Sequence, residues 1–305
     1  MHRRRFLTTL ATLPPLAGAA RSQAPAAEKP KDAAAEKDFV FLDNGQLRIG
    51  VKKSSGAGLA WLSRSGGENL LDHYDHGRLV QQSYYGKEDG SRWVDKPWRW
   101  NPVQGGDYRG NASTVLELTS DQASLHARIR PRNWAGGQLL TDCEMEQNVR
   151  LEGDVAIVKF RFRYTGTETH PAHSQELPAV FLRPALDTLV HYDGEKPWTG
   201  AALQRSRPGW PNESRNIPEG WAAYVNAENQ GAGVYAPVAR VLTCYRFGAN
   251  AAAPSACSYF APLATFAIRP GLDFSYEIAL TTGTPDAMRA AFAKLKGRLL
   301  AKLPE

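Results

Sequence analysis

The sequence has 305 residues, of which 42% are hydrophobic and 22% charged, and its formal net charge is +6 at pH 7. Its first 24 residues contain four arginines and no acidic residue, which leaves only +2 for the rest of the chain. Because no lysine- or arginine-rich run remains beyond that segment, the composition argues against a phosphate-tracking surface, and we expect no nucleic-acid partner. A membrane-spanning helix needs about 20 consecutive apolar residues, and no other segment has a run of that length. We therefore expect no membrane span in the mature chain.

The N-terminus has the features of an export signal. Residues 3–7 read Arg-Arg-Arg-Phe-Leu, which fits the RRxFL pattern of a twin-arginine signal, and a short apolar run follows at residues 10–16. We predict a twin-arginine signal peptide at 1–24, a disordered Ala/Lys/Glu/Pro linker at 25–37 and one domain at 38–305. The expected location is periplasmic or secreted, with the twin-arginine translocase as a partner during export.

The body of the chain reads as short strands. From Val155 to Tyr164, apolar residues alternate with Lys and Arg, which predicts a strand with one buried and one wet face. Similar alternation recurs along the chain with Gly, Pro, Asn and Asp between the strands, and this pattern is typical of an all-β antiparallel sandwich or barrel. One helix is predicted at the end, where Thr284 can cap it, Pro285 suits the first turn, and an apolar stripe follows up to Leu299.

Three cysteines occur, at positions 143, 244 and 257. Cys244 and Cys257 fall on candidate neighbouring strands and could form a disulfide in an oxidising compartment. Three buried free thiols are the alternative.

The stretch from Asp72 to Asn111 departs from strand alternation. It is rich in Trp and Tyr, interleaved with His, Arg, Gln and Asp. Aromatic rings can stack on the C–H face of a sugar while the polar groups bind its hydroxyls, so this stretch indicates a carbohydrate site. The alternative is an elaborate structural loop with its Trp side chains packed inward.

Three strings carry a family resemblance. The string SSGAGLAWLSRSGGENLLDHYDHGR resembles the opening of galactose-mutarotase-like proteins, with Arg78 as their substrate-facing arginine. The string FRFRYTGTETHPAHSQELPAVFL resembles their long strand and the loop that carries a catalytic histidine, which makes His173 the best match and His170 the second. The closing YEIALTTG, followed by a helix, fits the end of that fold.

The resemblance implies an all-β antiparallel β-supersandwich with a C-terminal α-helix that handles carbohydrate. It does not imply mutarotation, because the Asn-His-x-Tyr-Phe-Asn string of the mutarotases is replaced here by His-Ser-Gln-Glu-Leu, and their late glutamate has no counterpart that we can locate. The fold also serves lyases, glycosidase domains and epimerases, so fold alone does not choose a reaction.

From these residues we predict one cleft formed by the segments 76–107 and 173–176. His173 is the expected acid/base, Glu176 its partner, and Arg78 the group that neutralises a substrate carboxylate. Arg78 could instead pair structurally with Asp72 or Asp75, and Asp107 could either join Glu176 in a glycosidase pair or shape a turn. The predicted substrate-binding residues are His76, Gln82, Tyr84, Tyr85, Trp100, Gln104 and Asp107.

The predicted function is that of an exported carbohydrate-active enzyme, a lyase or a glycoside hydrolase, acting on a poly- or oligosaccharide. A non-catalytic glycan-binding protein, or a sugar epimerase or mutarotase, is the alternative. We expect no cofactor. We also expect no metal, because the two His-x-x-His strings lack the glutamate and the helical context of a zinc motif.

Overall fold

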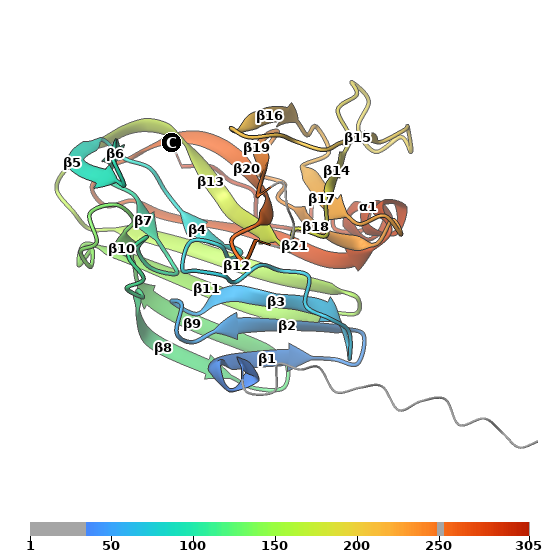
Figure 1. Ribbon diagram of the computed structural model, residues 1–305, viewed down its shortest axis with the longest axis horizontal. Helices are drawn as coiled ribbons and strands as arrows, with labels where there is room; N and C mark the ends of the chain where they lie inside the picture. The colour runs from blue at the N-terminus through green and yellow to red at the C-terminus, as the bar shows by residue number, and fades with distance from the viewer. Residues whose placement is uncertain (1–34, 249–252, 305) are drawn as a thin grey trace, which may run out of the picture.

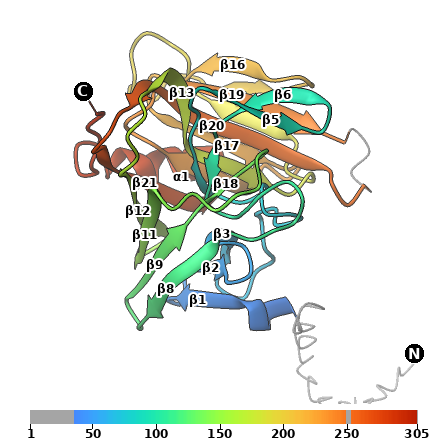
Figure 2. The same ribbon diagram turned by 90° about the vertical axis from the view of Figure 1, so that its left-hand side faces the viewer.

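The computed structural model describes residues 35–248 and 253–304. In this part of the chain, two large antiparallel sheets stack face to face, with a smaller sheet at one end and one α-helix outside (Figure 1). Figure 2 shows that the small sheet β1–β2–β3 lies at the opposite end of the molecule from β16 and β19.

The larger sheet has nine strands. In spatial order they are β15 (Gln204–Ser206), β14 (Thr188–His191), β17 (Trp221–Val225), β18 (Gly231–Tyr235), β21 (Asp273–Gly283), β12 (Val155–Tyr164), β11 (Cys143–Glu152), β9 (Ser124–Arg130) and β8 (Thr114–Ser120).

The second sheet has seven strands. In spatial order they are β10 (Arg132–Asn133), β7 (Pro102–Val103), β4 (Gln81–Ser83), β13 (His170–Leu182), β20 (Cys257–Ile268), β19 (Val241–Phe247) and β16 (Glu213–Asn216).

The remaining elements are short. A 3-10 turn η1 (Ala35–Asp38) leads into the three-stranded sheet of β1 (Phe39–Asp43), β2 (Leu47–Lys52) and β3 (Gly58–Arg64). A separate hairpin consists of β5 (Glu88–Trp93) and β6 (Lys96–Arg99), and α1 (Pro285–Ala293) follows the last strand.

The main core lies between the two large sheets. Phe160 and Phe162 of β12 meet Phe260 and Phe266 of β20 in one buried apolar cluster. On the opposite face of β12, Arg161 pairs with Glu146 and Asp273 on the two flanking strands. The apolar residues of the alternating pattern therefore lie on the face toward the core, and the charged residues lie on the other face, where they form cross-strand pairs. This is the arrangement expected for a strand with one side in water.

The helix α1 covers the outer face of the nine-stranded sheet. The Thr284 hydroxyl accepts a hydrogen bond from the Ala287 backbone N–H at 3.3 Å, which caps the first turn. Phe292 is fully buried and packs against Trp221 and Tyr235 of the sheet. The apolar stripe therefore forms a second, smaller core outside the sandwich.

The predicted all-β supersandwich with a C-terminal helix is confirmed. The predicted signal at 1–24 lies outside the described residues, as does most of the linker, whose last residues form part of η1, where Glu36 pairs with Arg48. Within the described part of the chain, no helix combines the length and the apolar character needed to cross a membrane.

The disulfide that we considered is not formed, and all three cysteines are free and buried. Cys244 lies opposite Phe260 and Cys257 opposite Phe247 in the β19–β20 register. The two thiols are therefore offset by three positions along the paired strands and point to opposite faces, because side chains alternate along a strand.

We predict that Phe292→Ala lowers the free energy of unfolding by about 3–5 kcal/mol, because it empties a fully buried aromatic site between α1 and the sheet. Urea unfolding followed by circular dichroism measures this loss. Leu300→Ala is the control, since Leu300 is 39% exposed and should cost far less. Equal losses in the two variants would contradict a helix held on the sheet by its apolar stripe.

Candidate functional site

A row of aromatic rings crosses the outer face of the seven-stranded sheet. Phe181 of β13 pairs in register with Tyr259 of β20, which pairs in turn with Tyr245 of β19. The ring centroids are 4.6 Å and 4.4 Å apart along this row. Directly paired residues point to the same face, so the sheet carries a continuous, largely buried aromatic cluster on the side away from the main core.

Glu176 of β13 is the buried carboxyl group on this face. It is 9% exposed and accepts a hydrogen bond from the Tyr259 hydroxyl, with Tyr85 and Ser83 as further hydrogen-bonding neighbours. Burial raises the pKa of Glu176, and the hydrogen bonds from Tyr259 and Ser83 oppose part of that rise. The arrangement favours a carboxyl group that keeps its proton to higher pH than a glutamate in water.

The loop before β4 brings a guanidinium group to the same face. The Asp75 carboxylate accepts backbone hydrogen bonds from Gly77 and Arg78, both at 2.9 Å, and also pairs with the Arg78 side chain. Arg78 lies within hydrogen-bonding reach of the Cys257 thiol at the start of β20. The structural pairing of Arg78 that the sequence left open is therefore made with Asp75.

Asp72 is a second carboxyl group near Arg78. It is 8% exposed, its Oδ1 accepts from the Tyr74 backbone N–H at 2.9 Å, and its Oδ2 is buried without a partner. Burial raises the pKa of Asp72 to about 6, although the Tyr74 hydrogen bond and the charge of Arg78 act in the opposite direction. An unpartnered buried oxygen of this kind is costly and is common at functional sites.

Tyr245 connects the carboxyl and guanidinium groups. Its pKa is raised, first by burial and then by the charges of Cys257 and Glu176, while Arg78 acts in the opposite direction. Glu176 and Arg78 therefore lie close enough to one ring to influence its ionisation. We define the cluster of Glu176, Tyr259, Tyr85, Tyr245 and Arg78 as the candidate site.

His173 lies away from this cluster. Its ring nitrogen Nδ1 accepts a hydrogen bond from Nη1 of Arg99, on the β6 hairpin strand, at 3.1 Å. Burial, followed by the charge of Arg99, lowers the pKa of His173, so the ring is neutral at pH 7. His173 and Glu176 are three positions apart on a regularly paired part of β13, so their side chains point to opposite faces and have separate partners.

His173 is also far from Arg78. It pairs with Phe266 near one end of β20, whereas Arg78 reaches Cys257 at the other end, about 30 Å away along the strand. The single cleft that we predicted around both groups is therefore not formed. The segments 76–107 and 173–176 do meet, but at separate points, through Arg99 and His173 and through Tyr85 and Glu176.

Several predicted substrate-binding residues are in the interior between the sheets. Gln82, Tyr84 and Gln104 are 0% exposed. The Tyr84 hydroxyl donates to Gln82 at 2.9 Å, and Gln104 donates to Gln147 at 3.0 Å. These amides satisfy one another and nearby backbone carbonyls, so a substrate contact for them has no support in this structure.

Trp100, His76 and Asp107 hold other parts of the structure. The Trp100 ring is 6% exposed and stacks on His170 at 3.9 Å. His76 contacts Ser55 and the Gly110 carbonyl, both at 3.0 Å. The Asp107 carboxylate accepts from Arg109 and Asn111, as expected for the turn-shaping alternative.

Sequence analysis missed Phe181, Tyr245, Tyr259, Asp72 and the neighbouring Trp210. The three strand residues belong to runs that alternate like any other strand, so no local signal distinguishes the outer face of this sheet. Trp210 was detectable, because a tryptophan between Gly209 and Pro211 lies in a turn-forming string where a large ring has little reason to be buried.

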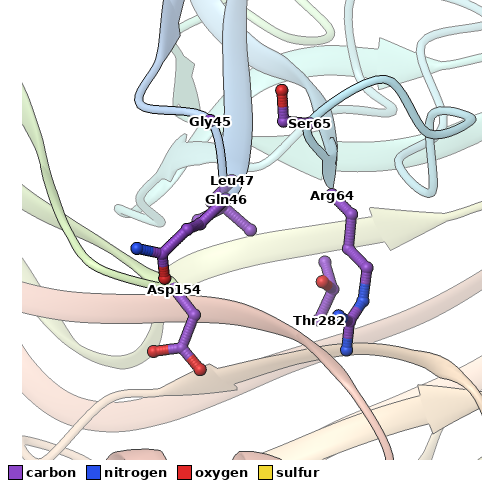
Figure 3. A pocket seen from close by; sticks show the side chains of 7 residues that line it. All are labelled: Gly45, Gln46, Leu47, Arg64, Ser65, Asp154 and Thr282. Atoms are coloured by element: carbon purple, nitrogen blue, oxygen red, sulfur yellow. The ribbon is translucent and has the colours of Figure 1, made fainter.

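A concave cavity of about 430 Å³ lies elsewhere, where the small sheet meets the large one (Figure 3). Its charged side chains are Arg64 and Asp154, both exposed, and it includes none of the cluster residues. We therefore place the candidate site by its buried ionisable groups and not by this hollow. Within residues 35–248 and 253–304, no group of three or more His, Cys, Asp or Glu side chains is arranged to hold a metal ion.

The stacked antiparallel sheets have the fold of solved galactose mutarotase-like proteins. A galactose mutarotase-like protein from Lactobacillus casei ATCC 334 is similar to this chain with a TM-score of 0.51 at 13% identity, over 80% of this chain and 99% of that one. A galactose mutarotase related enzyme from Lactobacillus acidophilus gives a TM-score of 0.53 at 10% identity, over 80% and 97%. The sequence matches no protein-family model and no curated protein.

We predict that Asp72→Asn stabilises the protein at pH 7 and not below about pH 4. Because the pKa of Asp72 is about 6 in the fold and near 3.8 when unfolded, the folded state holds the proton more tightly, and stability falls as pH rises through this window. Asparagine keeps the Oδ1 acceptor and removes the penalty, which is at most about 3 kcal/mol. Urea unfolding at both pH values measures the difference.

The control for this prediction is Asp193→Asn, because Asp193 is exposed. It should change stability little at either pH. A gain in Asp72→Asn of equal size at pH 4 and pH 7 would show that the effect is not due to ionisation.

Proposed function

We propose that the protein is an exported carbohydrate-active enzyme that acts on a poly- or oligosaccharide by proton transfer, with Glu176 as its acid/base. The observation that carries this proposal is the buried Glu176 carboxyl group, which accepts a hydrogen bond from the Tyr259 hydroxyl within the aromatic cluster on the outer side of the seven-stranded sheet. A carboxyl group with a raised pKa beside phenolic O–H groups is suited to give and take a proton.

The sequence pattern predicted His173 as the main acid/base, and we transfer this role to Glu176. Arg99 donates to His173, and its charge lowers the pKa of the ring, so His173 is a poor proton donor at pH 7. Glu176 has the opposite tendency, and Tyr245, which packs against the Tyr259 ring, is partly exposed and can contact a sugar.

Two reaction types use these groups differently. In a lyase, Arg78 would neutralise the carboxylate of a uronate while Glu176 or a tyrosine moves the proton. In a hydrolase, Glu176 would protonate the leaving oxygen, and Asp72 is the other buried carboxyl group near Arg78. The fold is shared with proteins described as galactose mutarotase-like and galactose mutarotase related, which supports a sugar substrate by analogy only.

A non-catalytic glycan-binding protein is the second candidate. The observation in its favour is the exposure of Trp210, which is 58% exposed beside Tyr245 and would serve binding without any chemistry. A sugar epimerase or mutarotase would use the same acid/base group on a smaller substrate.

We predict that Glu176→Gln lowers turnover by about 10²- to 10⁴-fold, because it removes the transferable proton and keeps the shape of the side chain. The assay is a panel of uronate-containing and neutral polysaccharides, read by the ultraviolet absorbance of unsaturated uronates and by the release of reducing ends. The first readout reports a lyase and the second a hydrolase.

Glu228→Gln is the matched control, because it makes the same substitution at an exposed position. It should keep full turnover, and both variants should keep the circular dichroism of the wild type. Full activity in Glu176→Gln would remove Glu176 from the mechanism. Binding without turnover in the wild type would favour the glycan-binding alternative.

Export is the second part of the proposal, and it is supported by the Arg-Arg-Arg-Phe-Leu string at residues 3–7. We predict that changing Arg3 and Arg4 together to Lys retains the precursor in the cytoplasm of a bacterial host, because the translocase reads the arginine pair. Fractionation and immunoblotting measure this retention. Arg21→Lys is the control, and a periplasmic double variant would contradict twin-arginine routing.

A further inference from the structure

An exposed pair of aromatic rings lies at the β16 edge of the seven-stranded sheet. Trp210 is 58% exposed and Phe247 is 39% exposed, and their ring centroids are 5.5 Å apart. Trp210 also packs edge-on against Tyr245 at 4.8 Å. Two large rings held in water beside each other form a surface that is suited to a ligand with an apolar face.

This pair is continuous with the candidate site. Trp210 contacts Tyr245, Tyr245 contacts Tyr259 at 4.4 Å, and the Tyr259 hydroxyl donates to Glu176. The contacts cross from β19 through β20 to β13, and the last step also runs along the strands, because Glu176 pairs with Leu263 and not with Tyr259. Neighbouring strands are about 4.8 Å apart, and β19 and β13 are two strand spacings apart. Trp210, which packs on β19, is therefore more than about 10 Å from the strand that carries Glu176.

The loop that carries Trp210 is fixed on both sides. The Gly209 backbone N–H donates to the Glu213 carboxylate at 2.6 Å, and the Gly209 carbonyl accepts from the Arg246 backbone N–H at 3.3 Å. On the other side, the Asn212 amide donates to Thr243 at 2.9 Å. A preorganised ring loses little conformational entropy when a ligand stacks on it.

We propose that Trp210 and Phe247 form a distal sugar-binding subsite for a chain whose reacting unit lies at Glu176. The inference rests on the proposed function and adds the direction of its saccharide chain, which runs across the strands from β13 toward β16. A monosaccharide at Glu176 would leave these rings uncovered. The continuous aromatic path to Glu176 favours a saccharide chain over a second copy of the protein as the occupant.

The test measures binding and not turnover. Glu176→Gln protein is titrated against homologous cello-, xylo-, manno-, galacturono- and mannurono-oligosaccharides, from the monosaccharide to the hexasaccharide. We expect at least one series in which affinity rises with length. Adding Trp210→Ala should weaken the longer members by about 3- to 10-fold, as expected for the loss of one stacking ring, and leave the shortest member unchanged.

Trp98→Ala in the same Glu176→Gln background is the matched control. Trp98 is a half-buried tryptophan of the β5–β6 hairpin. It packs on Trp93, which contacts Trp134 beside β10, at the opposite edge of the sheet from β16, so its loss should leave the dependence on length intact. Trp210 is exposed, so its replacement should not disturb folding, and a thermal melt of each variant checks this.

Three binding results would overturn the subsite, and so would one sedimentation result. The binding results are a dependence on length that survives Trp210→Ala, a loss caused by Trp98→Ala instead, and the absence of binding in every series. If sedimentation shows that the wild type is a dimer and that Trp210→Ala is a monomer, the two rings bind a second copy of the protein and not a saccharide. If turnover survives in Glu176→Gln while Trp210 still governs long chains, the proposed acid/base fails and the subsite stands.

Discussion

The structure depends on β20 having two apolar faces. Phe260 and Phe266 point into the core between the sheets, and Tyr259 and Cys257 point to the aromatic surface outside. A strand with only one buried face would present its other side chains to water. Here both faces are dry, so a carboxyl group placed on the neighbouring strand β13 loses most of its hydration although it lies on the outside of the sandwich.

That constraint accounts for the ionisation of the site. Glu176 and Asp72 have raised pKa values mainly because they are buried, and each keeps hydrogen bonds that oppose part of the rise. A buried carboxylate without a cation beside it reduces stability, and such costs are retained at sites where the proton has a use. Arg78 does not relieve Glu176 directly, because its guanidinium group pairs with Asp75.

The sequence predicted the fold because its evidence is local. The alternation over Val155–Tyr164 indicates a strand with one face in water, and Thr284 followed by Pro285 indicates the start of a helix. Neither signal depends on which distant residues the segment packs against. The site was harder to predict because it depends on register. A bulge lies between Glu176 and Val180, and only the pairing of Phe181, Tyr259 and Tyr245 shows which residues share a face.

The polar residues from 81 to 107 illustrate the same limit. Residue types that bind sugars also satisfy buried backbone, and Gln82 and Gln104 do so between the sheets, where their amides meet Glu146, Gly56 and Gln147. Composition cannot distinguish the two uses, because exposure decides between them. The partners of a side chain in turn follow from the face of the sheet that it occupies: Gln82 of β4 points between the sheets, whereas Ser83, and Tyr85 just beyond the strand, reach Glu176.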